Sequence, residues 1–197
     1  SWAQNITWRG FNVVLMDGST VRLRPYGDIP KRFAPHRTRS KTPYWCLMRV
    51  VVGFCFTTGL VVGSLMAATT VSEQALAAQF FAQALPQSLV IADRNFGVFS
   101  VVQAAAAARV EVLLRLTQLR AGRLARAHKT KLRCGLDLSI NWTPTRQVKI
   151  DGQSPIKEVQ GRLIVLRVQR RGFRAQVLCL FTTLTDRQTY GAADLLD

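Results

Sequence analysis

The sequence predicts an α/β fold in which one mixed β-sheet carries helices on its faces. Two short apolar runs with the composition of buried strands each end in an aspartate, at Asp17 and at Asp93. Strand-like and helix-like segments alternate between and beyond these runs, and a β-rich region follows them. The chain has 197 residues and is 48% hydrophobic, so it is long enough to bury one substantial core.

The first 118 residues hold the alternating elements. Their strand segments are short, rich in β-branched and aromatic residues, and bounded by turn residues. Ser72 predicts the N-cap of a first helix and Pro86 its end, while the alanines at 104–108 suit a second helix packed closely on a sheet. The expected strands cover residues 11–23, with a bend at Asp17-Gly18-Ser19, then 47–57, 60–67, 89–92 and 110–116, and the expected helices cover 72–85 and 95–108.

Residues 50–68 admit an alternative interpretation. These 19 residues carry no charge, which meets the length criterion for a membrane-spanning helix. Each half is nevertheless rich in β-branched and aromatic residues, and Thr57-Thr58-Gly59 interrupts the stretch with a turn signal. This composition favours two buried strands joined by a tight turn, so we expect no membrane association.

The pattern of predicted secondary structure changes after Leu116. A basic loop is expected there, followed by short strands at about 136–142, 162–169 and 175–182, with Gly172 in a hairpin turn. We interpret residues 119–184 as a β-rich insertion. Residues 185–197 are then expected to begin a final helix, whose first turn is at 192–197.

The charge is strongly positive and unevenly distributed. There are 27 Lys and Arg residues against 11 Asp and Glu residues, which gives a net charge of +16. Residues 22–49 contain eight basic residues and one acid, and residues 115–133 contain seven basic residues and no acid. A solvated basic face explains either cluster alone. The two clusters together favour a nucleic acid, bound through its phosphates with a steep salt dependence.

Asp17 and Asp93 admit two interpretations. An Asp-Gly pair is a common turn signal, and an Asp ahead of a helix is a common N-terminal charge. A carboxylate at the end of a buried strand, however, is costly without a partner, so it usually binds a metal, a base or a cation. The four cysteines form no CxxC pair and histidines are few, so zinc is not expected, and the pattern fits a reducing cytosol.

Several segments together resemble a known family. VVLMDGSTV, SLVIADRNFGVFSVVQAAAA, VEVLLRL and RRGFRAQVLCLFTTLTD, with Tyr190 after them, are similar to bacterial insertion-sequence transposases of the DDE class, insertion-sequence-four type. The similarity covers almost the whole chain in the family's order. It implies a ribonuclease-H-like fold, in which the first catalytic acid lies on the first strand and the second just past the fourth, on neighbouring strands.

The resemblance also implies a chemistry. Asp17 matches the first catalytic acid and Asp93 the second, and three carboxylates in this family hold two divalent ions, normally Mg²⁺ with Mn²⁺ as a substitute. The implied reaction is cleavage of double-stranded DNA at the element's ends and strand transfer to a target, by a homodimer in the bacterial cytoplasm at the nucleoid. Residues 1–118 would form the first part of the catalytic core. The expected DNA contacts are Arg94, Arg120, Arg123, Arg126, Lys129, Lys131 and Arg133.

The sequence departs from the family at the third acid. That glutamate belongs to a helix expected after Leu195, so we expect residues 185–197 to be the truncated start of the final catalytic helix and the fragment to be inactive alone. The alternative is a non-catalytic basic nucleic-acid-binding module, in which Asp17 and Asp93 are structural. The remaining acids in the second half stand in other motif contexts and are expected to be surface or capping residues: Glu111, Glu158, Asp186 and Asp194.

Overall fold

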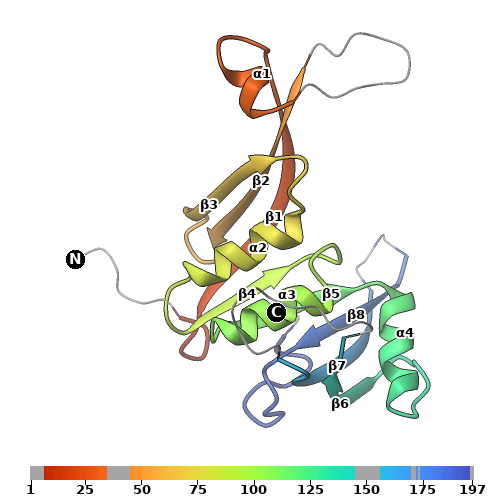
Figure 1. Ribbon diagram of the computed structural model, residues 1–197. Helices are drawn as coiled ribbons and strands as arrows, with labels where there is room; N and C mark the ends of the chain where they lie inside the picture. Colours follow the sequence, from red (N-terminus) through yellow and green to blue (C-terminus); the bar gives the residue numbers. More distant parts are fainter. Residues whose placement is uncertain (1–6, 35–44, 145–155, 170–171, 173, 196–197) are drawn as a thin grey trace.

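The computed structural model describes residues 7–34, 45–144, 156–169, 172 and 174–195. They form an eight-stranded mixed sheet in the order β3-β2-β1-β4-β5-β8-β7-β6, flanked by helices (Figure 1). The strands are β1 (Asn12–Leu23), β2 (Cys46–Cys55), β3 (Val61–Ala68), β4 (Ser88–Ala92), β5 (Glu111–Leu116), β6 (Leu136–Trp142), β7 (Val159–Val168) and β8 (Gln176–Thr182). The helices are α1 (Ile29–Arg32), α2 (Glu73–Ala82), α3 (Phe99–Ala107) and α4 (Gln118–Ala127).

Strand β1 joins the hairpin to the parallel centre of the sheet. It pairs in parallel with β4 from Asn12↔Ser88 to Met16↔Ala92, and β4 pairs in parallel with β5. The β2–β3 hairpin adds two antiparallel strands on the other side of β1. The first and fourth strands are therefore neighbours, as predicted.

The two faces of the sheet are covered differently. Helices α2, α3 and α4 pack on one face over the larger core, which includes Phe81 and Val101. Figure 1 shows α2 and α3 side by side over the central strands. The other face carries a smaller core around Leu89, Leu113 and Ile164, onto which chain segments at 8–11 and 184–195 pack. Each large apolar side chain buried in these layers stabilises the fold by about 1.5–3 kcal/mol.

Residues 119–184 contribute most of α4 and all of β6–β8. Strand β8 pairs with β5, so the three strands extend the same sheet. The basic loop predicted at the start of this region was wrong, because most of it is helix α4. Thr117 caps the helix by accepting a backbone hydrogen bond from its first turn. Ala121, Leu124 and Ala125 are buried, and their spacing puts them on one helical face.

A fully buried arginine connects β7 to the chain that follows β8. Arg162 forms an ion pair of 2.5 Å with Asp137 of β6 and donates to the carbonyl oxygens of Leu184 and Tyr190 at 3.2 and 2.7 Å. Arg187 adds a second ion pair to Asp137, at 3.3 Å. Burial raises the pKa of Asp137, but the hydrogen bonds and charges of the two arginines outweigh burial and hold that pKa below its ordinary value.

Several boundaries differ from the predictions. Strand β1 does not bend at Asp17, because its pairing with β2 continues to Leu23. Helix α3 begins at Phe99 rather than at position 95, because a turn follows β4. Residues 192–195 form a hydrogen-bonded turn, and positions 196 and 197 lie outside the described residues.

Residues 50–68 form most of the β2–β3 hairpin, as predicted. None of the helices in the described ranges is long and apolar enough to cross a membrane.

Candidate functional site

The two aspartates lie where β1 and β4 part. Met16↔Ala92 is the last pair of the parallel ladder; Asp17 is the next residue of β1, and Asp93 is the first residue after β4. Paired positions of parallel strands point to the same side of a sheet and side chains alternate along each strand, so the residues that follow Met16 and Ala92 leave the ladder from the same face. Both residues are exposed. The two acids that the sequence predicts as a site therefore follow directly on neighbouring positions of adjacent strands.

Each carboxylate accepts one backbone hydrogen bond from a residue that closely follows it in the chain. Gly18 N donates to Asp17 Oδ1 at 2.8 Å, and Asn95 N donates to Asp93 Oδ1 at 2.8 Å. The second bond is an Asx turn, in which a side chain replaces the backbone acceptor at the end of a strand. Among the described residues, no group donates to either Oδ2 atom. Each aspartate therefore keeps one oxygen for a ligand.

Sequence reasoning missed a third acid nearby, Glu73. It is the first residue of α2, and its side chain is 18% exposed. Asn95 Nδ2 donates to Glu73 Oε2. A Cβ atom added at Gly18 would lie 2.8 Å from Glu73 Cδ, so the glutamate packs directly on that glycine. The sequence offered one signal, an acid after the helix cap at Ser72, and this signal does not reveal contacts with distant residues.

Helix α4 begins beside the loop that follows Asp93. Arg120 Nη1 donates to the carbonyl oxygen of Arg94 at 3.4 Å. A Cβ atom at Gly97 would lie 2.4 Å from the carbonyl oxygen of Arg115, so this loop packs tightly on the end of β5. The basic helix therefore starts next to the acid pair.

The predicted DNA contacts lie on and after α4, apart from Arg94, which is exposed in the turn after β4. Arg120 is half-buried, and burial together with the nearby charge of Arg123 lowers its pKa. The other predicted contacts are exposed, and no carboxylate of the described residues pairs with them. These free cations are Arg123, Arg126, Lys129, Lys131 and Arg133.

The other basic cluster is spread over different surroundings. Arg22 and Arg24 are exposed at the far end of β1, whereas Arg49 is partly buried and lies 3.9 Å from Glu73. Positions 35–44 of this cluster lie outside the described residues.

The donor set suits a hard divalent cation, because carboxylate oxygens are the ligands that Mg²⁺ prefers. Two acids are a partial set, and the described residues contain no group of three acidic, histidine or cysteine side chains that could hold an ion. The other acids lie elsewhere. Glu111 stands at the opposite end of β5, Glu158 is exposed, Asp186 accepts hydrogen bonds within its own turn, and Asp194 pairs with Arg9 at 2.6 Å.

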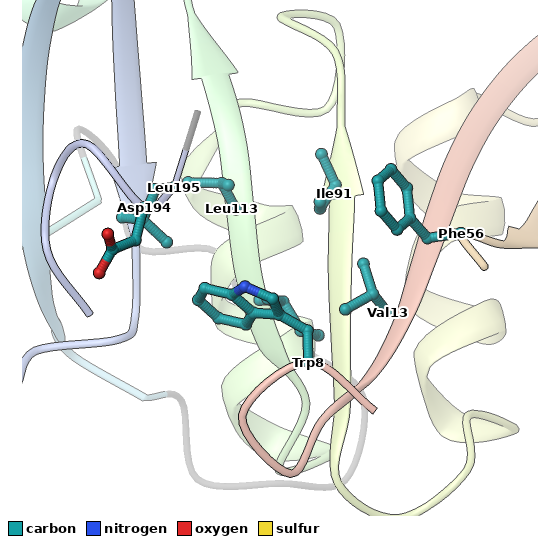
Figure 2. Close-up of a pocket in the computed structure, with 8 residues that line it drawn as sticks. Trp8, Val13, Phe56, Ile91, Leu113, Asp194 and Leu195 are labelled. Carbon is teal, nitrogen blue, oxygen red and sulfur yellow. The ribbon is translucent and has the colours of Figure 1, made fainter. Parts of the chain in front are cut away.

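An apolar hollow lies on the face of the sheet that carries the two aspartates. Val13, Ile91 and Leu113 line it from three neighbouring strands (Figure 2). Trp8 and Leu195 lie at its border. Within the described ranges, the smaller core on this face contains no helical residue.

The chain is similar to a known protein family and to solved structures. Residues 8–194 match the family model of the transposase DDE domain. The fold is similar to that of piggyBac transposase, solved as a synaptic complex with hairpin DNA, with a TM-score of 0.50 and 8% identity over 93% of this chain and 35% of that chain. Endonuclease V of Ciona intestinalis, solved with DNA, matches with a TM-score of 0.36 and 8% identity over 97% of this chain and 78% of that chain. No curated protein sequence matches the chain.

The match to piggyBac transposase confirms the predicted fold class, a ribonuclease-H-like mixed sheet flanked by helices. The chain spans 35% of the length of that protein. The family model extends from Trp8, just before β1, to Asp194, in the turn beside the apolar hollow, and it includes both acids and the basic helix. The chain belongs to the family of transposase DDE domains.

Proposed function

We propose that the chain is the core of a bacterial DNA transposase of the insertion-sequence-four type, which cuts DNA at the ends of its element and joins them to a target. The main support is the placement of Asp17 and Asp93 on one face of the sheet, with a basic helix beginning beside them. Membership of the transposase DDE family supplies the reaction class. The protein would act as a homodimer on paired DNA ends, in the cytoplasm at the nucleoid.

Asp17 and Asp93 are the residues that would hold the divalent metal, Mg²⁺ or its substitute Mn²⁺. Each keeps one carboxylate oxygen open, while Gly18 and Asn95 fix the other. Bound there, two such ions would supply activation of the attacking water or 3′-hydroxyl and stabilisation of the leaving oxygen. The chain's own contribution is to hold the two carboxylates in fixed directions and to bring the DNA backbone to them.

Residues 119–184 are the proposed DNA-holding insertion. Helix α4 starts at the loop of Asp93 and presents Arg123 and Arg126 to solvent. A duplex held at the start of this helix would bring phosphates to the edge of the sheet at which the Asp93 loop lies. Contacts to phosphate give affinity and register without reading the base sequence.

The third carboxylate is proposed to come from a helix that follows Leu195. The support is the apolar hollow, which Val13, Ile91 and Leu113 line from three neighbouring strands. A helix packed on this hollow would cover the face of β1 to which Asp17 points and would bring a carboxylate toward it. Sequencing the DNA after the codon for Asp197 tests the proposal: an open frame encoding such a glutamate supports it, and a stop codon contradicts it.

The function is tested by measuring duplex-DNA affinity by fluorescence anisotropy, in EDTA and in Mg²⁺ at constant ionic strength. We expect the metal to strengthen DNA binding about tenfold, because a cation held by the two carboxylates would attract phosphate, and we expect Asp17→Asn or Asp93→Asn to remove this gain. Asp28→Asn is the control, because it also removes one carboxylate but at an exposed pair with Lys31. A wild-type affinity that ignores the metal would contradict the proposal.

A non-catalytic nucleic-acid-binding module is the second candidate. It is favoured by the absence, within the described ranges, of a third acid close enough to complete an ion site. In that case Asp17→Asn and Asp93→Asn leave DNA affinity unchanged in both buffers, and substitutions on α4 still weaken it.

A further inference from the structure

We infer, on the basis of the proposed role of Asp17 and Asp93, that Glu73 is a positioning residue for the acid pair. It lies on the helical side of the sheet and connects the part of β1 that carries Asp17 to the loop that begins at Asp93. Its carboxylate contacts the one residue in each segment that donates a hydrogen bond to the aspartate there.

Asn95 is the contact in the loop after β4. Its side-chain Nδ2 donates to Glu73 Oε2, while its backbone N–H donates to Asp93 Oδ1 at 2.8 Å. Gln74 reinforces this contact, because its Nε2 donates to the Asn95 carbonyl oxygen at 3.0 Å and to Asn95 Oδ1 at 3.3 Å. Glu73 and Gln74, at the start of α2, therefore both form hydrogen bonds with Asn95. Asn95 in turn donates to Asp93.

Gly18 is the contact on β1. A Cβ atom there would lie 2.8 Å from Glu73 Cδ and 2.9 Å from Glu73 Oε2, closer than side-chain contacts allow. The Glu73 side chain therefore packs directly against the backbone of Gly18. Gly18 N in turn donates to Asp17 Oδ1 at 2.8 Å. A shift of Glu73 would therefore displace the two residues that donate hydrogen bonds to the aspartates.

Glu73 is itself held in place from two sides. Ser72 caps α2 by accepting from Ala75 N at 3.1 Å, and a carboxylate in the first turn is stabilised by the partial positive charge of a helix N-terminus. Arg49 Nε lies 3.9 Å from Glu73 Oε1, and Arg49 Nη1 donates to the carbonyl oxygens of Thr69 and Val71 at 3.2 and 2.5 Å. Strand β2 and the loop before α2 are thus tied to the glutamate.

Glu73 lies on the face of the sheet opposite to the one that Asp17 faces, so it cannot complete an ion site with the pair. Gly18 faces α2, and side chains alternate along β1, so Asp17 points to the other face. In the part of the chain that the structure describes, no three such side chains group into an ion site. Glu73 therefore acts through Gly18 and Asn95 rather than by touching metal or DNA.

The test compares Glu73→Ala, Glu73→Gln and Asn95→Ala, with Asp28→Asn as the control for the loss of one negative charge. Amide hydrogen exchange at Gly18 and Asn95, followed by NMR without metal, reports the two hydrogen bonds to the aspartates. Electron paramagnetic resonance titration with Mn²⁺ reports the affinity of the acid pair. Thermal unfolding shows that each variant is folded.

We expect Glu73→Ala to speed exchange at both amides and to weaken Mn²⁺ binding, each about tenfold. Glu73→Gln keeps an oxygen acceptor for Asn95 and should retain most of both properties. If Glu73→Ala does not fold, Asn95→Ala tests the inference instead. It removes the same hydrogen bond between Glu73 and position 95 and should weaken Mn²⁺ binding to a similar degree.

Two results would overturn the inference: exchange at Gly18 or Asn95 unchanged in folded Glu73→Ala, or faster exchange with unaltered Mn²⁺ affinity. A wild-type chain whose Mn²⁺ binding is insensitive to Asp17→Asn and Asp93→Asn would instead refute the proposed metal site. In that case the exchange data alone still show whether Glu73 couples β1 to the loop after β4.

Discussion

Asp17 and Asp93 each stand one residue beyond Met16 and Ala92, which form the last backbone pair between β1 and β4. Their proximity is therefore set by the pairing of two parallel strands and not by contact between the carboxylates. Two like charges on neighbouring strands repel each other, so this arrangement contributes nothing to the stability of the fold.

The first prediction concerns the stability of the fold when either aspartate is replaced. Asp17→Asn and Asp93→Asn should leave the free energy of unfolding unchanged within about 0.5 kcal/mol, or raise it, because both residues are exposed and asparagine keeps an acceptor oxygen. Urea unfolding followed by circular dichroism measures this. A loss of more than about 2 kcal/mol in either variant would assign the aspartates a structural role.

The second prediction concerns Asp137 and acid. Its pKa in the folded state is below the ordinary value of 3.8, so its contribution to stability is complete above that value and is lost as the pH falls through the folded-state pKa. Asp137→Ala should lower the free energy of unfolding at neutral pH by about 3–5 kcal/mol, because Arg162 would remain buried without its counter-charge. It should also remove part of the acid dependence below pH 3.8.

Urea unfolding of the wild type and Asp137→Ala between neutral and acidic pH tests both parts. Asp28→Asn is the matched control, since it breaks an exposed ion pair with Lys31 and should change stability by less than about 1 kcal/mol. Equal effects of the two substitutions would contradict the account of the buried pair.

The third prediction compares a tightly packed glycine with one that has open space around it. Gly97→Ala should destabilise the protein by about 1–3 kcal/mol, because its Cβ would lie 2.4 Å from the carbonyl oxygen of Arg115. Gly122→Ala, inside α4 with nothing within 4 Å of the added atom, should instead stabilise it by about 0.4–1 kcal/mol. Thermal unfolding of both variants tests the pair, and a tolerated alanine at position 97 would show that the loop after Asp93 does not pack on β5 as described.

The fourth prediction concerns DNA binding by α4. Replacing Arg123, Arg126 and Lys129 by alanine should weaken binding to duplex DNA of any sequence and reduce the slope of log affinity against log salt by about 2–3, because each lost phosphate contact removes about 0.9. Anisotropy titrations over a range of salt concentrations measure the slope. Arg109→Asn is the control, since it removes an exposed cation at the opposite end of β5, at a positive φ that asparagine tolerates. An equal change in the control would show that binding follows net charge and not this helix.

The elements of the central sheet could be predicted from the sequence because their signals are local. The hairpin follows from β-branched residues on either side of Thr57-Thr58-Gly59, and β4 from a short apolar run. Helix α4 was missed because its basic residues conceal a narrow buried stripe of Ala121, Leu124 and Ala125. The cap at Thr117 was the signal that could have found it.

The contacts around the candidate site could not be predicted in this way, because they join residues far apart in the chain. Nothing near Glu73 in the sequence indicates that it rests on Gly18 and accepts from Asn95. The same holds for Arg162, whose burial depends on Asp137 from another strand. Asp17 and Asp93 could be named in advance because the family motifs mark them, although their register is a property of the fold.

The most direct test of the central claim is an electron paramagnetic resonance titration of Mn²⁺ against the wild type, Asp17→Asn, Asp93→Asn and the double variant, with Asp28→Asn as control. If the two aspartates form one ion site, each single substitution weakens binding by at least about tenfold and the double variant is little worse than either one. Binding that survives both single substitutions, or effects that simply add, would show that Asp17 and Asp93 do not share a metal.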